Sequence, residues 1–179
     1  MAIKAIIFDC FGVLVENSVN LFCDTYLSDK PEVVAEIRRL DNLSTEGKMT
    51  WSELIDESVR LSGVDHGEVN RVLNVNPPNL TLFDYIAKEL KPYYKLGFLS
   101  NAAGDWLSDL FTPEQLALFD DFVLSYQHNI RKPDTAIFEL AASRLSVLPN
   151  ECILVDDVEV YCQGAREVGM FAIQYFSLD

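Results

Sequence analysis

Four polar clusters each follow a strand-length apolar run, and together they hold most of the side chains that could do chemistry. They are Asp9, Ser100-Asn101, Lys132 and Asp156-Asp157. Carboxylates gathered in this number make a hard-oxygen site suited to Mg²⁺, which takes one or two carboxylates together with waters and a substrate phosphate. A hydroxyl and an ammonium beside them would bind the remaining oxygens of the anion. The residue types therefore predict a magnesium and phosphate site, provided that the four clusters meet.

The segments before these clusters are short and almost continuously apolar, which is typical of a parallel sheet buried on both faces. These segments are Ala5–Phe8, Leu96–Leu99, Phe122–Leu124 and Ile153–Val155, with Phe171–Tyr175 as a fifth. Helical periodicity separates them, so we predict a doubly wound parallel α/β fold with crossover helices. In such sheets, ligands bind outside the carboxyl ends of the strands, and the four clusters should converge on that edge.

The pattern changes between residues 15 and 78, where strand-like runs vanish and amphipathic helices follow one another. Thr50-Trp51-Ser52-Glu53 is a capping box that begins one of these helices. We therefore predict a helical insertion over residues 15–78, carried by an α/β core domain made of residues 1–14 and 79–179. Within that core, a second capping box predicts a helix over residues 112–118.

Composition limits the partners that we expect. Of 179 residues, 14 are Lys or Arg and 28 are Asp or Glu, which gives a formal net charge of −14. Such a field repels nucleic acid and anionic membranes, so we expect neither as a partner. The four cysteines form no C-x-x-C pair, and no apolar run reaches the roughly 18 residues of a membrane span. We expect reduced thiols, a cytoplasmic location, and a monomer or homodimer.

The same clusters, in the same order, resemble the four motifs of the haloacid dehalogenase (HAD) superfamily. The matching segments are Asp9-Cys10-Phe11-Gly12-Val13-Leu14, Leu99-Ser100-Asn101-Ala102, Arg131-Lys132-Pro133-Asp134 and Val155-Asp156-Asp157, the last followed by Gly164-Ala165 and Gly169-Met170. The resemblance spans the whole chain, and the insertion resembles the small helical C1-type cap of that family. It implies a Rossmann-like core and a hydrolase activity.

The resemblance also implies roles for the residues that would meet the substrate. Asp9 would be the nucleophile that attacks phosphorus and forms an aspartyl-phosphate. Ser100 and Asn101 would bind the phosphoryl oxygens. Lys132 would neutralise both the nucleophile and the phosphate, so that Asp9, Lys132 and Ser100 make up the catalytic set.

The same resemblance implies a set of metal ligands, and it shows that Phe11 differs from the residue usual in the family. Asp9, Asp156, Asp157 and the backbone carbonyl of Phe11 would hold Mg²⁺. Phosphatases of the superfamily usually carry a second Asp in place of Phe11, and that Asp protonates the leaving group and later activates water. Phenylalanine moves no proton, and general acid–base catalysis is commonly worth about 10²–10⁴ in rate. We therefore expect slow turnover of substrates with poor leaving groups.

Our leading hypothesis is a Mg²⁺-dependent phosphatase that acts on a small phosphorylated metabolite. One alternative is a catalytically silent HAD-like protein that binds a phosphorylated ligand or a protein partner, because Phe11 removes the proton donor. A second is a metal-free 2-haloacid dehalogenase, a branch with an aromatic residue at this position. The pair Asp156-Asp157 favours metal, because that branch has a serine- and asparagine-containing loop there. Tyr161, where the family often has Asn, is a further departure.

Overall fold

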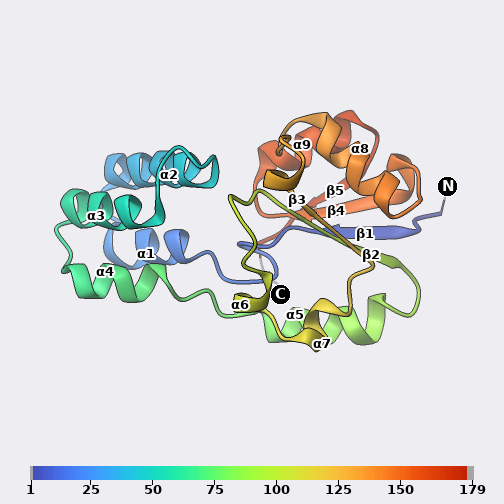
Figure 1. Cartoon of the computed structure of the whole chain (residues 1–179), viewed down its shortest axis with the longest axis horizontal. Coiled ribbons are helices and arrows are strands. Elements are labelled where there is room, and N and C mark those ends of the chain that lie inside the picture. The colour runs from blue at the N-terminus through green and yellow to red at the C-terminus, as the bar shows by residue number, and fades with distance from the viewer. Residues whose placement is uncertain (1, 177–179) are drawn as a thin grey trace. The chain divides into compact units, whose positions relative to one another are not determined.

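A computed structural model describes residues 2–176 of the chain, so the expectations that we placed on residues 1 and 177–179 lie outside the described residues. The chain divides into two compact units. One unit is Glu16–Pro77, and the other combines the segment that ends at Val15 with the segment that begins at Pro78. Each unit has a buried core of its own, and Figure 1 shows the elements of both.

A parallel sheet of five strands forms the centre of the unit that contains the predicted site residues. Its strands are β1 (Ala5–Phe8), β2 (Lys95–Ser100), β3 (Asp121–Leu124), β4 (Cys152–Asp156) and β5 (Phe171–Gln174). They lie in the order β3-β2-β1-β4-β5, and every neighbouring pair is parallel. The predicted doubly wound parallel α/β fold is confirmed, and each predicted strand end is within one residue of the observed one.

Helices cover both faces of this sheet, with α8 and α9 on one face and α5 and α7 on the other (Figure 1). The helical elements are α5 (Leu80–Tyr85), its π-helical continuation η1 (Ile86–Leu90), α6 (Leu107–Leu110), α7 (Pro113–Leu116), the 3₁₀ turns η2 (Ser125–Gln127) and η3 (Pro149–Glu151), α8 (Thr135–Arg144) and α9 (Glu159–Glu167). The capping box at Thr112 begins α7, but the helix ends two residues before the predicted Leu118. Tighter i→i−3 hydrogen bonds follow and turn Phe119 into the core.

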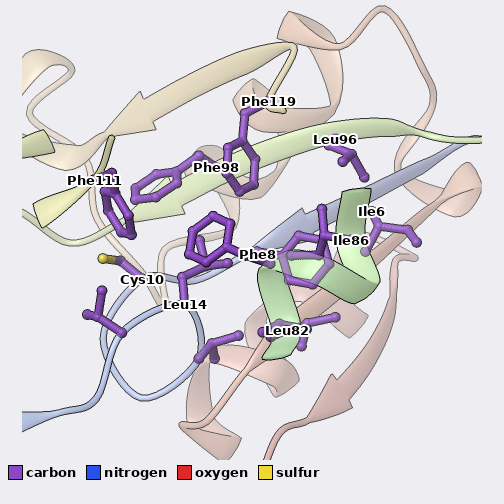
Figure 2. Close-up of a cluster of buried hydrophobic side chains, with 14 of the residues drawn as sticks. Ile6, Phe8, Cys10, Leu14, Leu82, Ile86, Leu96, Phe98, Phe111 and Phe119 are labelled. Carbon is purple, nitrogen blue, oxygen red and sulfur yellow. The ribbon is translucent and has the colours of Figure 1, made fainter. Parts of the chain in front are cut away.

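Alternation along β1 divides its side chains between two hydrophobic cores. Ile6 and Phe8 face the core beneath α5, where aromatic rings dominate (Figure 2). Phe98 and Phe119 meet there edge to face, with ring centroids 5.5 Å apart. Ala5 and Ile7 face the opposite core, which α8 and α9 cover. Burying one such large side chain contributes about 1.5–3 kcal/mol. The two cores therefore stabilise the strands whose carboxyl ends carry the predicted site residues.

The second unit consists of four helices around a core that includes Phe22, Ile37 and Leu54. The helices are α1 (Ser18–Tyr26), α2 (Pro31–Thr45), α3 (Trp51–Ser62) and α4 (His66–Leu73). The capping box predicted at Thr50 is present, with both reciprocal hydrogen bonds. Gly63 ends α3 in the left-handed conformation, at a φ of 76°, which glycine adopts without strain.

Among the described residues, no helix is long and apolar enough to cross a membrane. The cytoplasmic location and the monomeric or homodimeric state stay predictions.

A buried hydroxyl in α3 offers a test of this packing. Ser58 is fully buried, and among the described residues its Oγ has no hydrogen-bond partner. An unpaired buried hydroxyl costs about 1–3 kcal/mol, so we expect Ser58→Ala to raise the free energy of unfolding by about 1 kcal/mol in urea denaturation. Ser62→Ala is the matched control and should lower it, because Ser62 Oγ accepts from the Val64 N–H at 3.1 Å. Equal losses from the two substitutions would contradict this account of the helical core.

Candidate active site

Three strands bring predicted site residues to the carboxyl edge of the sheet. Asp9 directly follows β1, Ser100 is the last residue of β2, and Asp156 is the last residue of β4. The backbone N–H of Asp9 donates to the carbonyl of Val155 at 2.9 Å, which extends the pairing of β1 and β4 to this edge. Lys132 reaches the same place from the loop between η2 and α8.

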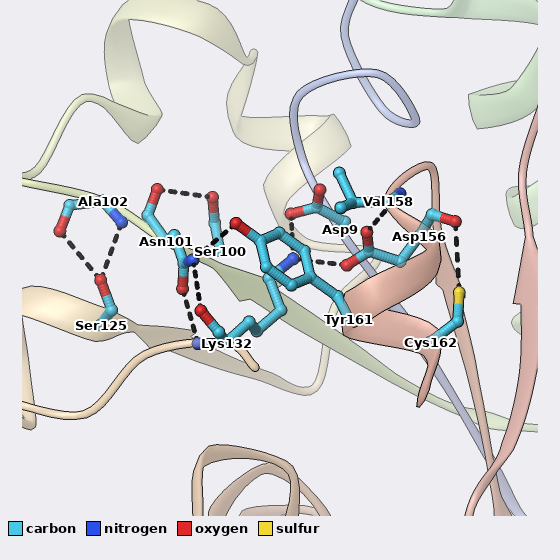
Figure 3. A network of polar contacts seen from close by, with 10 residues as sticks. All are labelled: Asp9, Ser100, Asn101, Ala102, Ser125, Lys132, Asp156, Val158, Tyr161 and Cys162. Carbon is cyan, nitrogen blue, oxygen red and sulfur yellow. Dashed lines mark hydrogen bonds and ion pairs between the residues drawn. The ribbon is translucent and has the colours of Figure 1, made fainter. Parts of the chain in front are cut away.

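The centre of the site is a buried ion cluster around Lys132 (Figure 3). Its Nζ lies 2.7 Å from Asp9 Oδ1 and 2.5 Å from Asp156 Oδ2. The Lys132 side chain is only 1% exposed and that of Asp156 is fully buried. Removing one partner of such a group leaves an uncompensated buried charge, which costs about 3–5 kcal/mol. The three side chains therefore depend on one another.

Burial and neighbouring charges shift the pKa values of this cluster in opposite directions. Burial raises the pKa of Asp9 to about 7; Lys132 opposes this shift, whereas the carboxylates of Asp156 and Asp157 add to it. Burial alone would lower the pKa of Lys132, but Asp156 and Asp9 outweigh that effect and hold the pKa above its usual value. Lys132 is thus an ammonium ion at neutral pH, while Asp9 holds its negative charge at a cost.

A third carboxylate completes a set of possible metal ligands. Asp9, Asp156 and Asp157 each offer an oxygen, and these atoms lie within 4.8 Å of one another. Burial, followed by the negative charge of Asp156, raises the pKa of Asp157 to about 6. Three carboxylates thus face one ammonium, and a hard divalent cation would relieve their mutual repulsion. Mg²⁺ fits this oxygen donor set and its charge.

Gly12 allows Asp157 to approach the loop after β1. A Cβ placed on Gly12 would lie 2.3 Å from Asp157 Oδ2, far inside van der Waals contact. The residue also has a φ of +86°, which favours glycine. Both observations require glycine at this position. The loop that follows the Asp9 strand is therefore shaped around the carboxylate of Asp157.

Ser100 and Asn101 do not occupy equivalent places. Ser100 is 1% exposed, and its hydroxyl donates to the Asn101 carbonyl at 3.5 Å. The Asn101 side chain holds the Lys132 backbone on both sides, because Nδ2 donates to the Lys132 carbonyl at 3.0 Å and Oδ1 accepts from the Lys132 N–H at 2.9 Å. Asn101 thereby fixes the loop that carries Lys132. That either residue binds phosphate stays a prediction.

Phe11 belongs to the aromatic core in part. Its ring is half-buried and packs edge to face against Trp106, with centroids 5.0 Å apart. Trp106 in turn packs against Phe98 with the two rings tilted and their centroids 6.4 Å apart. The side chain that replaces the usual proton donor is therefore a packing element. The expected contact of its backbone carbonyl with a metal stays a prediction.

Three groups support the site through contacts that the sequence did not predict, although Tyr161 stands out in the sequence as a departure from the family. Ser125, which directly follows β3, holds the loop after β2, because its Oγ accepts from the Ala102 N–H at 2.9 Å and donates to the Ala102 carbonyl at 3.1 Å. The Val158 N–H donates to Asp156 Oδ1 at 2.9 Å. Tyr161 contacts both Lys132 and Asn101. Ser125 could have been found, because it too is polar and follows an apolar strand.

Comparison with known proteins supports a single family. The sequence model of the haloacid dehalogenase-like hydrolases matches residues 3–169. No curated protein sequence matches the chain.

Solved structures share the fold over nearly the whole chain. A HAD family enzyme from Bacteroides thetaiotaomicron, in complex with magnesium and inorganic phosphate, is 23% identical, with a TM-score of 0.64 over 96% of this chain and 93% of that one. A predicted HAD-like family hydrolase from Porphyromonas gingivalis is 25% identical, with a TM-score of 0.62 over 97% of this chain and 91% of that one. A dehalogenase is 19% identical, with a TM-score of 0.71 over 95% and 83%.

The close approach at Gly12 leads to a prediction. We expect Gly12→Ala to weaken Mg²⁺ binding at least about tenfold in calorimetric titration, because the added methyl group would displace the carboxylate of Asp157, which we predict to be a ligand. Gly169→Ala is the matched control, since Gly169 has a similar φ of +89° and nothing lies within 4 Å of its would-be Cβ. That control carries the backbone strain without the clash. Unchanged affinity in Gly12→Ala would show that Asp157 does not bind the ion.

Proposed function

The chain belongs to the haloacid dehalogenase-like hydrolases, and from its site we propose that it is a Mg²⁺-dependent phosphatase that acts on a small phosphorylated metabolite. The observation that carries the proposal is the buried cluster in which Lys132 contacts Asp9 and Asp156. Asp157 adds the third carboxylate that a divalent cation needs. The enzyme of Bacteroides thetaiotaomicron that was crystallised with magnesium and inorganic phosphate supports the same pair of ligands for this fold.

In the proposed reaction, Asp9 is the nucleophile. A carboxylate oxygen of Asp9 forms a bond to phosphorus while the bond from phosphorus to the ester oxygen breaks, and the leaving oxygen keeps the electron pair. Water then attacks the phosphorus of the aspartyl-phosphate, which releases phosphate and restores the carboxylate. Lys132 favours the ionised form of Asp9 against the effect of burial. The positive charge of its ammonium would also offset the negative charge of the phosphoryl group that Asp9 attacks.

Asp9, Asp156 and Asp157 would hold Mg²⁺. When bound, this ion supplies positive charge that offsets the repulsion between a carboxylate and a phosphate ester.

Phe11 affects both halves of this reaction. In the first half, the leaving oxygen receives no proton from this side chain, so substrates with poor leaving groups react slowly. In the second half, water receives no help from a base at this position. A substrate with an activated leaving group escapes the first limitation but not the second. We therefore propose that breakdown of the aspartyl-phosphate is the slow step for such substrates.

We further propose that the helical unit Glu16–Pro77 acts as a cap that admits only small substrates. The unit is inserted a few residues after Asp9. The two connections run side by side, because Val15 bridges to Pro78 and the Glu16 N–H donates to the Pro77 carbonyl at 3.1 Å. Paired connections of this kind form a short stem at which a cap can hinge.

Two other functions compete with this proposal. A silent, ligand-binding protein is favoured by Phe11, whose ring is built into the packing around Trp106. A metal-free dehalogenase is the second competitor, and a dehalogenase shares the fold at 19% identity. The position of Asp157 opposes it, because a third carboxylate in the cluster raises repulsion unless a cation is bound.

Pre-steady-state kinetics with p-nitrophenyl phosphate test the proposal. We expect a burst of about one p-nitrophenolate per protein molecule, followed by slower turnover, because this leaving group needs no proton while the aspartyl-phosphate is hydrolysed without a base. Chelation of Mg²⁺ and Asp9→Asn should each abolish both phases. Asp29→Asn, at an exposed loop position, is the control and should leave both phases intact. Turnover by Asp9→Asn at the rate of the unaltered protein would refute the enzyme hypothesis, and metal-independent release of chloride from 2-chloropropionate would favour the dehalogenase.

Substitution of Phe11 tests the missing proton donor. We expect Phe11→Asp to increase turnover of alkyl phosphates by about 10-fold or more, as a fraction of the usual acid–base contribution. The same variant should melt at a lower temperature, since a carboxylate replaces a ring packed against Trp106. Phe11→Leu is the control, because it loses the ring without gaining an acid. Equal rates on alkyl phosphates for the two variants would contradict the argument.

A further inference from the structure

We propose that Tyr161 is a positioning residue for Lys132: its ring face holds the ammonium against the two carboxylates, and its hydroxyl joins the amide that fixes the Lys132 backbone. The consequence for turnover rests on the proposed function. The contact itself does not.

The ring of Tyr161 lies against the ammonium of Lys132. Tyr161 projects from the first turn of α9, and Lys132 Nζ lies 4.9 Å from the centroid of its ring. Figure 3 shows the ring beside the end of the Lys132 side chain. This distance is within the range of about 6 Å in which the ring quadrupole attracts a cation. Because Lys132 is 1% exposed, water competes little for the ammonium, and the attraction is stronger than at a surface.

The hydroxyl of Tyr161, at the other end of the ring, accepts a hydrogen bond from Asn101. Asn101 Nδ2 donates to the Tyr161 hydroxyl at 3.4 Å. The same amide holds the Lys132 backbone, with contacts of 3.0 Å to its carbonyl and 2.9 Å from its N–H. Tyr161 therefore touches both the tip of the Lys132 side chain and the group that anchors its main chain. A residue that only filled space would need neither contact.

A neutral aromatic ring suits the place beside the Lys132 ammonium better than another charged group would. Two of the three N–H groups of Lys132 have carboxylate partners in Asp9 and Asp156. A further carboxylate there would add negative charge to a cluster in which burial and repulsion already raise the pKa of Asp9. An aromatic face attracts the cation without net charge. The ring thus restrains the ammonium on its remaining side and leaves its charge directed at Asp9.

A series of residues at position 161 separates the ring from the hydroxyl. Tyr161→Leu removes the ring, and we expect the rate of the p-nitrophenolate burst, which reports the attack by Asp9, to fall by about 3- to 30-fold. Tyr161→Phe keeps the ring and should lose less. Phenylalanines that carry one, two and three ring fluorines have a progressively weaker quadrupole and nearly constant shape, so the rate should fall stepwise along that series. Tyr93→Leu, at a side chain that is 76% exposed, is the control and should not change the rate.

Nuclear magnetic resonance tests the contact without any turnover. In protein labelled with ¹³C at the lysine ε-carbon, the Lys132 ε-methylene protons should show an upfield ring-current shift, with the signal assigned by its loss in Lys132→Arg. The shift should persist in Tyr161→Phe and vanish in Tyr161→Leu. If no phosphate ester is turned over, the proposed function fails, and the presence of this shift would still support the contact. Absence of the shift would overturn the inference, and so would equal burst rates along the fluorine series in protein that turns over p-nitrophenyl phosphate.

Discussion

The site depends on one buried ammonium ion shared between two carboxylates. Lys132 comes from the loop after β3, Asp9 from the end of β1 and Asp156 from the end of β4, so their contacts of 2.7 and 2.5 Å join three segments that are distant in the chain. Because burial destabilises each charged form, removing any one of the three side chains would leave the charge of another without a partner. The surrounding groups follow from this constraint. Asn101 grips the Lys132 backbone, and the Val158 N–H satisfies the second oxygen of Asp156.

The ion cluster around Lys132 does not depend on a proton donor at position 11. The charged groups of the site can therefore be present although Phe11 transfers no proton. In the proposed reaction, attack on phosphorus requires a charged nucleophile and compensating cations. Asp9 would be that nucleophile, Lys132 would be one cation, and the carboxylate set would hold the other. Proton transfer is a separate requirement, and Phe11 removes the usual group for it. Its ring does not leave a gap, because it packs against Trp106 at 5.0 Å. In the proposed reaction, electrostatic stabilisation would therefore be retained while acid–base catalysis is reduced.

Local patterns were sufficient to predict the strands and the convergence of Asp9, Lys132 and Asp156, because a buried parallel strand is a short apolar run and its polar successor lies at the carboxyl edge. Groups held by distant contacts were not predictable in this way. Nothing around Gly12 indicates that the carboxylate of Asp157 approaches it, and nothing in the segment around Tyr161 indicates that Lys132 lies over its ring. The early end of α7 also depends on a tertiary contact. Its capping box forms as predicted, but the helix ends before Leu118, and Phe119 is buried in the core.

The proposed reaction requires the carboxylate of Asp9 to become phosphorylated. The most direct measurement is to mix the protein and Mg²⁺ with ³²P-labelled p-nitrophenyl phosphate, quench in acid within the first turnover, and map the labelled peptide. We expect a hydroxylamine-sensitive label on Asp9, and this label should accumulate because Phe11 provides no base for hydrolysis of the aspartyl-phosphate. Product release with no label on Asp9, or with the label on another residue, would contradict the account.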